Sequence, residues 1–133
     1  MKPSGTTTIT TRYLNLWGKD MIIIEEIVYE YLTATMDVPV YMTRPENVSG
    51  QYVLVEKTGG DESNKIRMSS FAFQSYGDTL LEAIRLNEVV KAAVEDLIAS
   101  PEITGIHFNT DYNFTNTADK RPRYQATFDI YHY

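Results

Sequence analysis

Two runs near the C-terminal end of the chain alternate regularly between apolar and polar positions. The first run, residues 103–114, places Ile106, Phe108, Tyr112 and Phe114 on one face and Gly105, His107, Asn109, Asp111 and Asn113 on the other. The second run places Tyr124, Ala126, Phe128 and Ile130 against Arg123, Gln125, Thr127 and Asp129. A period of two is typical of a strand with one buried face, and the polar segment 116–121 separates the runs. The pattern predicts an antiparallel hairpin over residues 103–133.

Two other segments have the wider spacing of amphipathic helices. The first is predicted over residues 21–35, with Asp20 as its N-cap and an apolar stripe of Ile23, Ile24, Ile27, Val28, Tyr31 and Leu32. The second follows a capping box formed by Thr79 and Glu82 and ends before Pro101. Its predicted buried positions are Ala83, Leu86, Val90, Ala93, Val94 and Leu97, with Arg85, Glu88, Lys91 and Glu95 in solvent.

The residues between the two helices predict a short strand and a second hairpin. Residues 38–42 contain Pro39, which suits an edge or the start of a strand. Residues 51–58 are apolar on both faces, as expected for an interior strand that is covered on both sides. The segment 59–64 has the glycine and polar composition of a turn, and residues 65–76 alternate again.

The order helix, short strand, hairpin, helix, hairpin predicts an α+β fold. We expect a mostly antiparallel sheet of four to five strands with two helices packed on one face. A chain of 133 residues is about one domain, here residues 20–133, preceded by a partly flexible extension at residues 1–19. The C-terminal hairpin leaves an open sheet edge, which proteins usually cover or pair. Pairing with another subunit gives rings or filaments when the contact is head-to-tail.

Composition and charge narrow the possible functions. The chain has no cysteine, which excludes disulfides, thiolate metal sites and thiol nucleophiles. Its net charge of −6 argues against binding nucleic acid by phosphate neutralisation, which needs a basic surface. The apolar runs, such as residues 21–24, are too short for a membrane span, and the threonine-rich start has no apolar core of a secretory signal.

No catalytic or metal-binding set emerges from the residues. His107 and Asp111 share the polar face of the predicted hairpin but lie roughly 13 Å apart along a strand, too far to bind one metal together. His132 is penultimate and is expected to fray. Gly59 and Gly60 lack the further glycine and lysine of a phosphate loop and favour a hairpin turn. We therefore expect no enzyme activity, no cofactor and no metal.

The order and spacing of these elements resemble those of a known family. The segments that carry the resemblance are Tyr-Val-Leu-Val-Glu-Lys-Thr-Gly-Gly at residues 52–60, Ser-Phe-Ala-Phe at 70–73 and Arg-Tyr-Gln-Ala-Thr-Phe at 123–128. Over residues 21–133 the chain is similar to the tail terminators of long-tailed bacteriophages, also called tail-completion or tail-to-head joining proteins. The extension at residues 1–19 departs from the usual early start of the first helix and leaves the role of that end open.

The resemblance implies a non-enzymatic α+β protein of the virion tail or neck, assembled in the host cytoplasm. Such a protein forms a homo-hexameric ring that caps the tail tube, ends its polymerisation and receives the connector or completion protein of the head. DNA passes through the lumen, where an acidic surface repels it. The family has no catalytic residues to transfer.

Two polar turns are the predicted partner-facing elements, because binding residues tend to lie on loops that extend from rigid strands. The candidate interface residues are Gly59, Gly60, Asp61, Glu62 and Asn64 in the first turn, and Asn116, Asp119, Lys120 and Arg121 in the second. Two other interpretations remain open at this point: a head-completion or neck adaptor protein, and a small ligand-binding α+β domain unrelated to phage.

Overall fold

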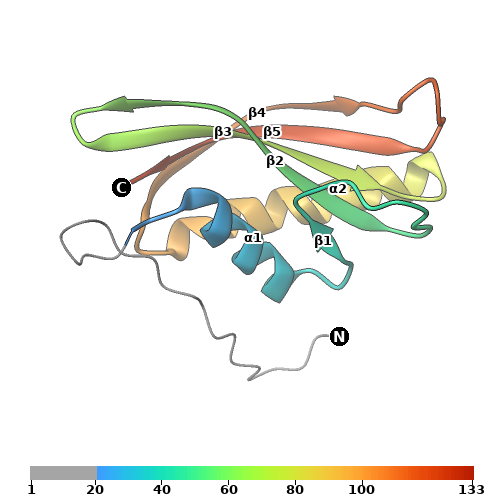
Figure 1. Ribbon diagram of the computed structural model, residues 1–133, viewed down its shortest axis with the longest axis horizontal. Helices are drawn as coiled ribbons and strands as arrows, with labels where there is room; N and C mark the ends of the chain where they lie inside the picture. Colours follow the sequence, from blue (N-terminus) through green and yellow to red (C-terminus); the bar gives the residue numbers. More distant parts are fainter. Residues whose placement is uncertain (1–20) are drawn as a thin grey trace.

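The computed structural model describes residues 21–133, so the predicted extension at residues 1–19 and the predicted cap Asp20 lie outside the described residues. Its elements, in chain order, are α1 (Ile24–Thr35), β1 (Val40–Tyr41), β2 (Tyr52–Ser63), β3 (Ile66–Tyr76), α2 (Leu80–Asp96), the 3₁₀ turn η1 (Leu97–Ala99), β4 (Ile103–Asn113) and β5 (Arg123–His132) (Figure 1).

The strands form one sheet in the order β1-β2-β3-β5-β4, and only the short β1 runs parallel to its neighbour. Both helices pack on the same face of this sheet, which we call the helix face (Figure 1). The predicted α+β fold, with its mostly antiparallel sheet and its two helices on one face, is therefore confirmed. The two edges of the sheet are β1 and β4.

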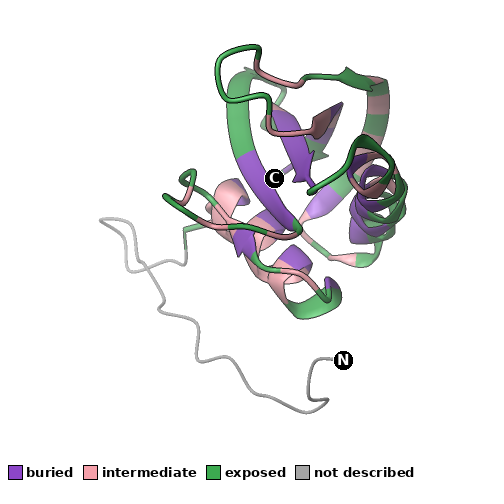
Figure 2. Cartoon of the chain, turned by 90° about the vertical axis from the view of Figure 1, so that its right-hand side faces the viewer, coloured by how far each residue is buried: buried purple, intermediate pink, exposed green. Residues whose placement is uncertain are grey.

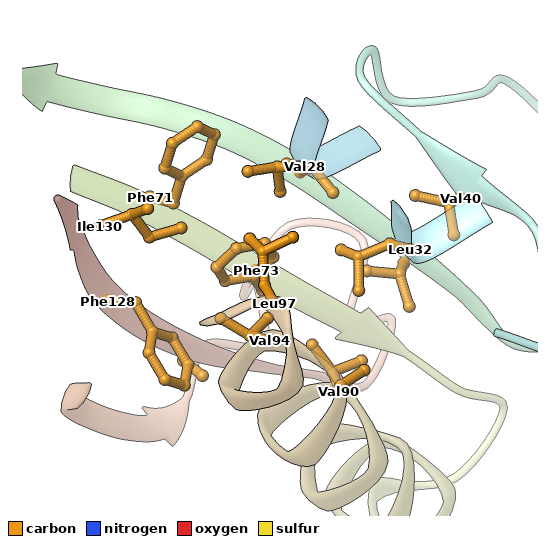
Figure 3. Packing of buried hydrophobic residues seen from close by; sticks show 14 of the residues in the cluster. Val28, Leu32, Val40, Phe71, Phe73, Val90, Val94, Leu97, Phe128 and Ile130 are labelled. Carbon is orange, nitrogen blue, oxygen red and sulfur yellow. The ribbon is translucent and has the colours of Figure 1, made fainter. Parts of the chain in front are cut away.

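The main core lies between the helix face and the two helices. Phe71, Phe73, Phe128 and Ile130 from the central strands are fully buried, and they meet an apolar layer contributed by both helices. That layer contains Val28 and Leu32 of α1, Val90 and Val94 of α2, and Leu97 of η1 (Figure 3). Burying a large apolar side chain stabilises a fold by about 1.5–3 kcal/mol, so these contacts hold the two layers together. Figure 2 shows the buried side of α2 turned toward the strands.

The two helices begin differently from each other. α2 has the predicted cap: Thr79 Oγ1 accepts from the backbone N–H of Glu82 at 3.2 Å, and the carboxylate of Glu82 accepts from the N–H of Asp78 at 3.0 Å. α1 begins three residues later than predicted, at Ile24, and its N-cap residue Ile23 makes no side-chain cap bond. Since no polar cap fixes its start, burial of its apolar stripe is what stabilises α1.

The opposite face of the sheet, which we call the outer face, carries a second small core. Tyr52, Leu54 and Tyr76 are buried there, with Tyr41 and Val48 packed against them. This confirms that β2 is covered on both sides over residues 52–55. The cover on the outer face is the loop between β1 and β2 rather than a helix, which the sequence pattern did not predict.

The predicted alternation in the C-terminal hairpin is wrong beyond Phe108. Phe108 lies opposite Phe128, but the next pair is Thr110 with Thr127, so the register shifts by one residue between Phe108 and Thr110. Such a bulge exchanges the two faces of the strand. As a result Asp111 turns to the helix face, while Tyr112 and Phe114 turn to the outer face.

The strand end at the C-terminus is ordered, not frayed as predicted. His132 is 1% exposed and its Nε2 lies 2.8 Å from the hydroxyl of Ser69 on β3. Burial lowers the pKa of His132 below its usual value. His132 is therefore a packed residue of the sheet.

Candidate partner-binding surfaces

The two predicted partner-facing turns lie at opposite ends of the sheet (Figure 1). The β2–β3 turn is at the end that also holds the C-terminus, whereas the β4–β5 loop, residues 114–122, is at the other end beside the loop before β2. The candidate residues are thus not brought together into one site. They form two separate surfaces, one at each end.

At the first end the turn is shorter than predicted. β2 continues through Gly59, Gly60, Asp61 and Glu62, which pair with β3, and the chain reverses only at Asn64–Lys65. Both turn residues have positive φ, 51° and 66°, as in the tight turns that suit the twist of a hairpin. The prediction that Gly59 and Gly60 form the turn is therefore wrong.

The two glycines lie within the paired strand instead. The register of β2 against β3 shifts between Lys57 and Gly59, and a Cβ atom on Gly60 would lie 3.0 Å from the carbonyl oxygen of Met68. Residues 56–67 are all exposed, and β1 pairs with β2 only at Val53 and Leu54. Among the described residues, this end therefore presents an uncovered ribbon with a free outer edge.

At the second end the candidate loop is bound to the rest of the protein at several points. Arg121 donates to the carbonyl oxygen of Val48 at 3.0 Å and to that of Gly50, and its guanidinium lies 5.5 Å from the ring centre of Tyr52. It also lies 3.6 Å from the carboxylate of Asp78. Arg121 is thus a structural clamp that holds the loop before β2 against the sheet.

Asp119 and Asn116 are also engaged within the protein. Asp119 is ion-paired with Arg44, and this guanidinium lowers the pKa of the Asp119 carboxyl below its usual range. Asn116 accepts from the N–H of Ala118 at 2.7 Å and, through its carbonyl, from that of Lys120 at 2.8 Å. Of the four candidates in this loop, Lys120 is the one whose exposed side chain makes no hydrogen bond or ion pair within residues 21–133.

A polar network crosses the outer face beside this loop. Arg123 donates to the hydroxyl of Tyr76 at 2.8 Å, which donates to Gln74 at 3.1 Å. Gln74 donates to Gln125 at 2.9 Å, and Gln125 donates to the hydroxyl of Tyr112 at 2.6 Å. Because each member satisfies the next, the network fixes the position of Tyr112 at the edge of the sheet.

Tyr112 and Phe114 form an exposed aromatic pair at the end of β4. Their rings meet edge to face with centres 5.7 Å apart, and they are 39% and 37% exposed. The guanidinium of Arg123 lies 4.6 Å from the ring centre of Phe114. Tyrosine, phenylalanine and arginine are enriched at the centres of protein interfaces. The straight alternation placed both rings in the core, so the sequence pattern missed this surface.

On the helix face the bulge creates an ion pair. Asp111 accepts from Lys91 of α2 at 2.9 Å and from Asn87 at 2.8 Å. Hydrogen bonding to Lys91 lowers the pKa of Asp111, and the carboxylate in turn raises the pKa of Lys91. Lys91, predicted to be solvated, therefore ties α2 to the edge strand, and Asp111 is separated from His107, which stays on the outer face.

Within residues 21–133 no group of three or more His, Asp or Glu side chains is arranged to hold a metal ion. In the same part of the chain, no helix combines the length and the apolar character that crossing a membrane requires.

Comparison with known proteins shows similarity at the level of the fold. No protein family model matches the chain, and no curated protein matches it in sequence. Among solved structures, the chain is similar to a protein chain from the virion of a native gene transfer agent particle, with a TM-score of 0.58 and 18% sequence identity. The similarity covers 82% of this chain and 93% of the other, so the two share nearly the whole fold.

Proposed function

We propose that this chain is a structural protein of a phage or phage-like virion, and that it forms a ring that caps the tail tube and joins it to the head. In this role it ends polymerisation of the tube and offers its other side to the connector or completion protein of the head. Its partners are further copies of itself, expected to be six, the tail tube protein and the head protein. DNA only passes through the lumen.

The observation that carries this proposal is the shared fold with a component of a gene transfer agent virion, which extends over nearly the full length of that chain. At the β4–β5 end, the polar side chains of Asn116, Asp119 and Arg121 are engaged in structural bonds. Together with the virion origin of the similar chain, this supports an assembly role.

The placement of the two candidate surfaces fits a protein that joins two different partners. A capping ring must contact the tube on one axial side and the head on the other. The β2–β3 turn and the β4–β5 loop lie at opposite ends of one sheet (Figure 1). Each end is therefore placed to meet a different partner, because the packed sheet separates the two.

The charge of the chain suits passage of DNA. α1 carries Glu25, Glu26 and Glu30 and no basic residue, whereas α2 carries charges of both signs, and the chain as a whole has a net charge of −6. An acidic surface repels the phosphates of DNA, so DNA passes it without binding. This feature supports a lumen role without assigning which residues line the lumen.

Electron microscopy of particles made without this protein tests the proposal. Overlong tubes are expected when the protein ends polymerisation. Tails of normal length that lack heads would instead favour the alternative of a neck adaptor. Normal, fully joined particles would refute both roles.

Charge reversals at the two ends refine the test. Asp61→Lys with Glu62→Lys changes the hairpin end, and Lys120→Glu changes the loop end; Asp96→Lys on α2 is the matched control. We expect one of the two ends to be needed for tail length and the other for head attachment. The same defect from both ends would contradict the assignment of one partner to each end.

A further inference from the structure

The bulge in β4 gives this one edge strand two different surfaces on opposite faces of the sheet. On the outer face, Tyr112, Phe114 and Arg123 form what we call the aromatic knob. On the helix face, Ile106 and Phe108 line a hollow that we describe next. Without the shift between Phe108 and Thr110, both sets of apolar side chains would face the helices.

The second surface is a shallow hollow between β4 and the end of α2. It has a volume of about 210 Å³ and is lined by Glu95, Ile98, Ile106 and Phe108, and we call it the α2–β4 hollow. Ile98 is 50% exposed, although it is a large apolar side chain. The hollow is thus apolar at its base, with one carboxylate among its lining residues.

The chemistry of the two surfaces is complementary. The knob offers two exposed rings and a guanidinium, and the hollow offers aliphatic and aromatic walls with a carboxylate. Nη1 and Nε of Arg123 donate to the hydroxyl of Tyr76 and to the carbonyl oxygen of Phe114. The remaining nitrogen, Nη2, has no acceptor among residues 21–133. In the same part of the chain Glu95 has no cationic partner. An arginine and a carboxylate that meet in a partly desolvated contact form a strong, directional hydrogen-bonded pair.

We infer that the aromatic knob of one copy docks into the α2–β4 hollow of a second copy of this chain. The inference rests on the proposed function only in that the ring supplies the second copy. Knob and hollow point to opposite faces of the sheet and lie roughly 20 Å apart along β4, at about 3.3 Å per residue from Phe108 to Phe114. A single neighbour cannot cover both at once.

That geometry makes the contact head-to-tail. Each copy uses its knob toward one neighbour and its hollow toward the other, as closed rings and open filaments require. A two-fold symmetric dimer would use the same patch on both partners instead. The knob is the expected anchor, since a few buried aromatic and arginine side chains carry most of the affinity of an interface.

The absence of cysteine makes a direct crosslinking test simple. Thr110→Cys places a thiol beside the knob on its own face, and Ala99→Cys places one at an exposed position next to Ile98, which lines the hollow. We expect a short bis-maleimide to yield a dimer only when the two variants are mixed, and a ladder of higher species when both thiols are in one chain.

Two outcomes would overturn the inference. Crosslinked dimers from either single variant alone indicate a two-fold contact, and no dimer in the mixture at high concentration means that knob and hollow do not meet. Phe114→Asp in the Thr110→Cys chain should reduce the crosslink yield about 30-fold, the loss expected for a hot-spot residue worth about 2 kcal/mol. The matched control is Ile66→Asp, because Ile66 is similarly exposed at the β2–β3 end; an equal loss there would also overturn the inference.

Failure of this inference and failure of the proposed function have different readouts. If Phe114→Asp still gives tails of normal length with heads attached, the docking inference fails while the capping role stands. If the mixed thiols crosslink as expected but particles without the protein have normal joined tails, the capping role fails while the head-to-tail contact stands.

Discussion

The contact between Asp111 and Lys91 gives the sharpest test of the bulge in β4. Asp111→Asn removes the carboxylate that binds Lys91 at 2.9 Å, while its amide keeps the size of the side chain. Both side chains are about three-quarters buried, with exposures of 25% and 22%. In a strand without the bulge Asp111 would face away from α2, and the same change would have no effect on stability.

The expected loss lies between two known limits. Exposed ion pairs contribute about 0.2–1 kcal/mol, and breaking a fully buried pair costs about 3–5 kcal/mol. For this partly buried pair we expect Asp111→Asn to lower the free energy of unfolding by about 1–2 kcal/mol at pH 7. The midpoint of thermal unfolding should fall by roughly 3–8 °C for a domain of this size.

The pH dependence follows from the direction of the two pKa shifts. The pKa of Asp111 is lower in the folded state than in the unfolded state. The carboxylate of Asp111 therefore stabilises the fold above pH 3.8, the usual pKa, and this stabilisation is lost as the pH falls through the folded pKa. The pKa of Lys91 is raised in the folded state, so the charged Lys91 stabilises the fold below pH 10.5, the usual pKa. This stabilisation is lost as the pH rises through the folded pKa. The difference between wild type and Asp111→Asn should therefore be largest near neutral pH and shrink below pH 4.

Urea unfolding over this pH range is the assay, with Lys91→Met and the double variant completing a thermodynamic cycle. Asp96→Asn, an exposed carboxylate on α2, is the control and should change little. A coupling energy near zero between Asp111 and Lys91, or equal effects of the Asp111 and Asp96 changes, would show that Asp111 does not face α2.

Three further predictions concern other parts of the fold. Arg121→Ala should cost about 1–3 kcal/mol, because it removes the clamp on the loop before β2; thermal unfolding measures the loss, and an unchanged midpoint would contradict the clamp. Gly77→Ala should destabilise by about 1–3 kcal/mol, since its Cβ would lie 2.8 Å from backbone and side-chain atoms of α2, whereas Gly59→Ala meets no atom within 4 Å and should be neutral. The pKa of His132 is lowered by burial, so stability should decline as the pH falls below 6.5; His132→Gln should remove this dependence, and the same change at the exposed His107 should keep it.

The sequence predicted those elements whose apolar spacing is unbroken. Every position assigned to the buried stripe of α2 is buried, and the cap at Thr79 is formed as its spacing with Glu82 predicted. α1 and β3 were also found by their period. In these elements the backbone keeps its regular repeat from end to end, so the spacing of apolar residues is sufficient to predict which side chains are buried.

The prediction failed where the backbone departs from its regular repeat. Neither Asn109 in β4 nor Thr58 in β2 is a residue type that marks a bulge, yet each lies at a register shift. Since one extra residue reverses every later side chain, Asp111, Tyr112 and Phe114 were all assigned to the wrong face. Pairing with a neighbouring strand decides this register, and a single sequence does not record that pairing.

The internal bonds of the β4–β5 loop escaped the sequence for a different physical reason. Polar residues such as Asn116, Asp119 and Arg121 suit both a free binding loop and a loop that satisfies its own backbone groups. The partners of Arg121 are carbonyl oxygens about 70 residues away in the chain. No local pattern reveals such a contact, so the residue types alone did not separate a binding role from a structural one.

The open edge predicted from the sequence does exist, but its irregular register changes how another copy is expected to use it. β4 carries register shifts after Ile103 and after Phe108, and bulges of this kind interrupt the even row of backbone groups that a continuing strand needs. Extension of the sheet from copy to copy is therefore disfavoured along β4. The same irregularity turns Phe108 and Phe114 to opposite faces of the strand, and it thereby supplies two side-chain surfaces in place of one backbone edge. Contacts through side chains select a partner by shape and charge, whereas a bare strand edge accepts any extended chain. A protein that must stop adding copies at a closed ring gains from the first kind of contact.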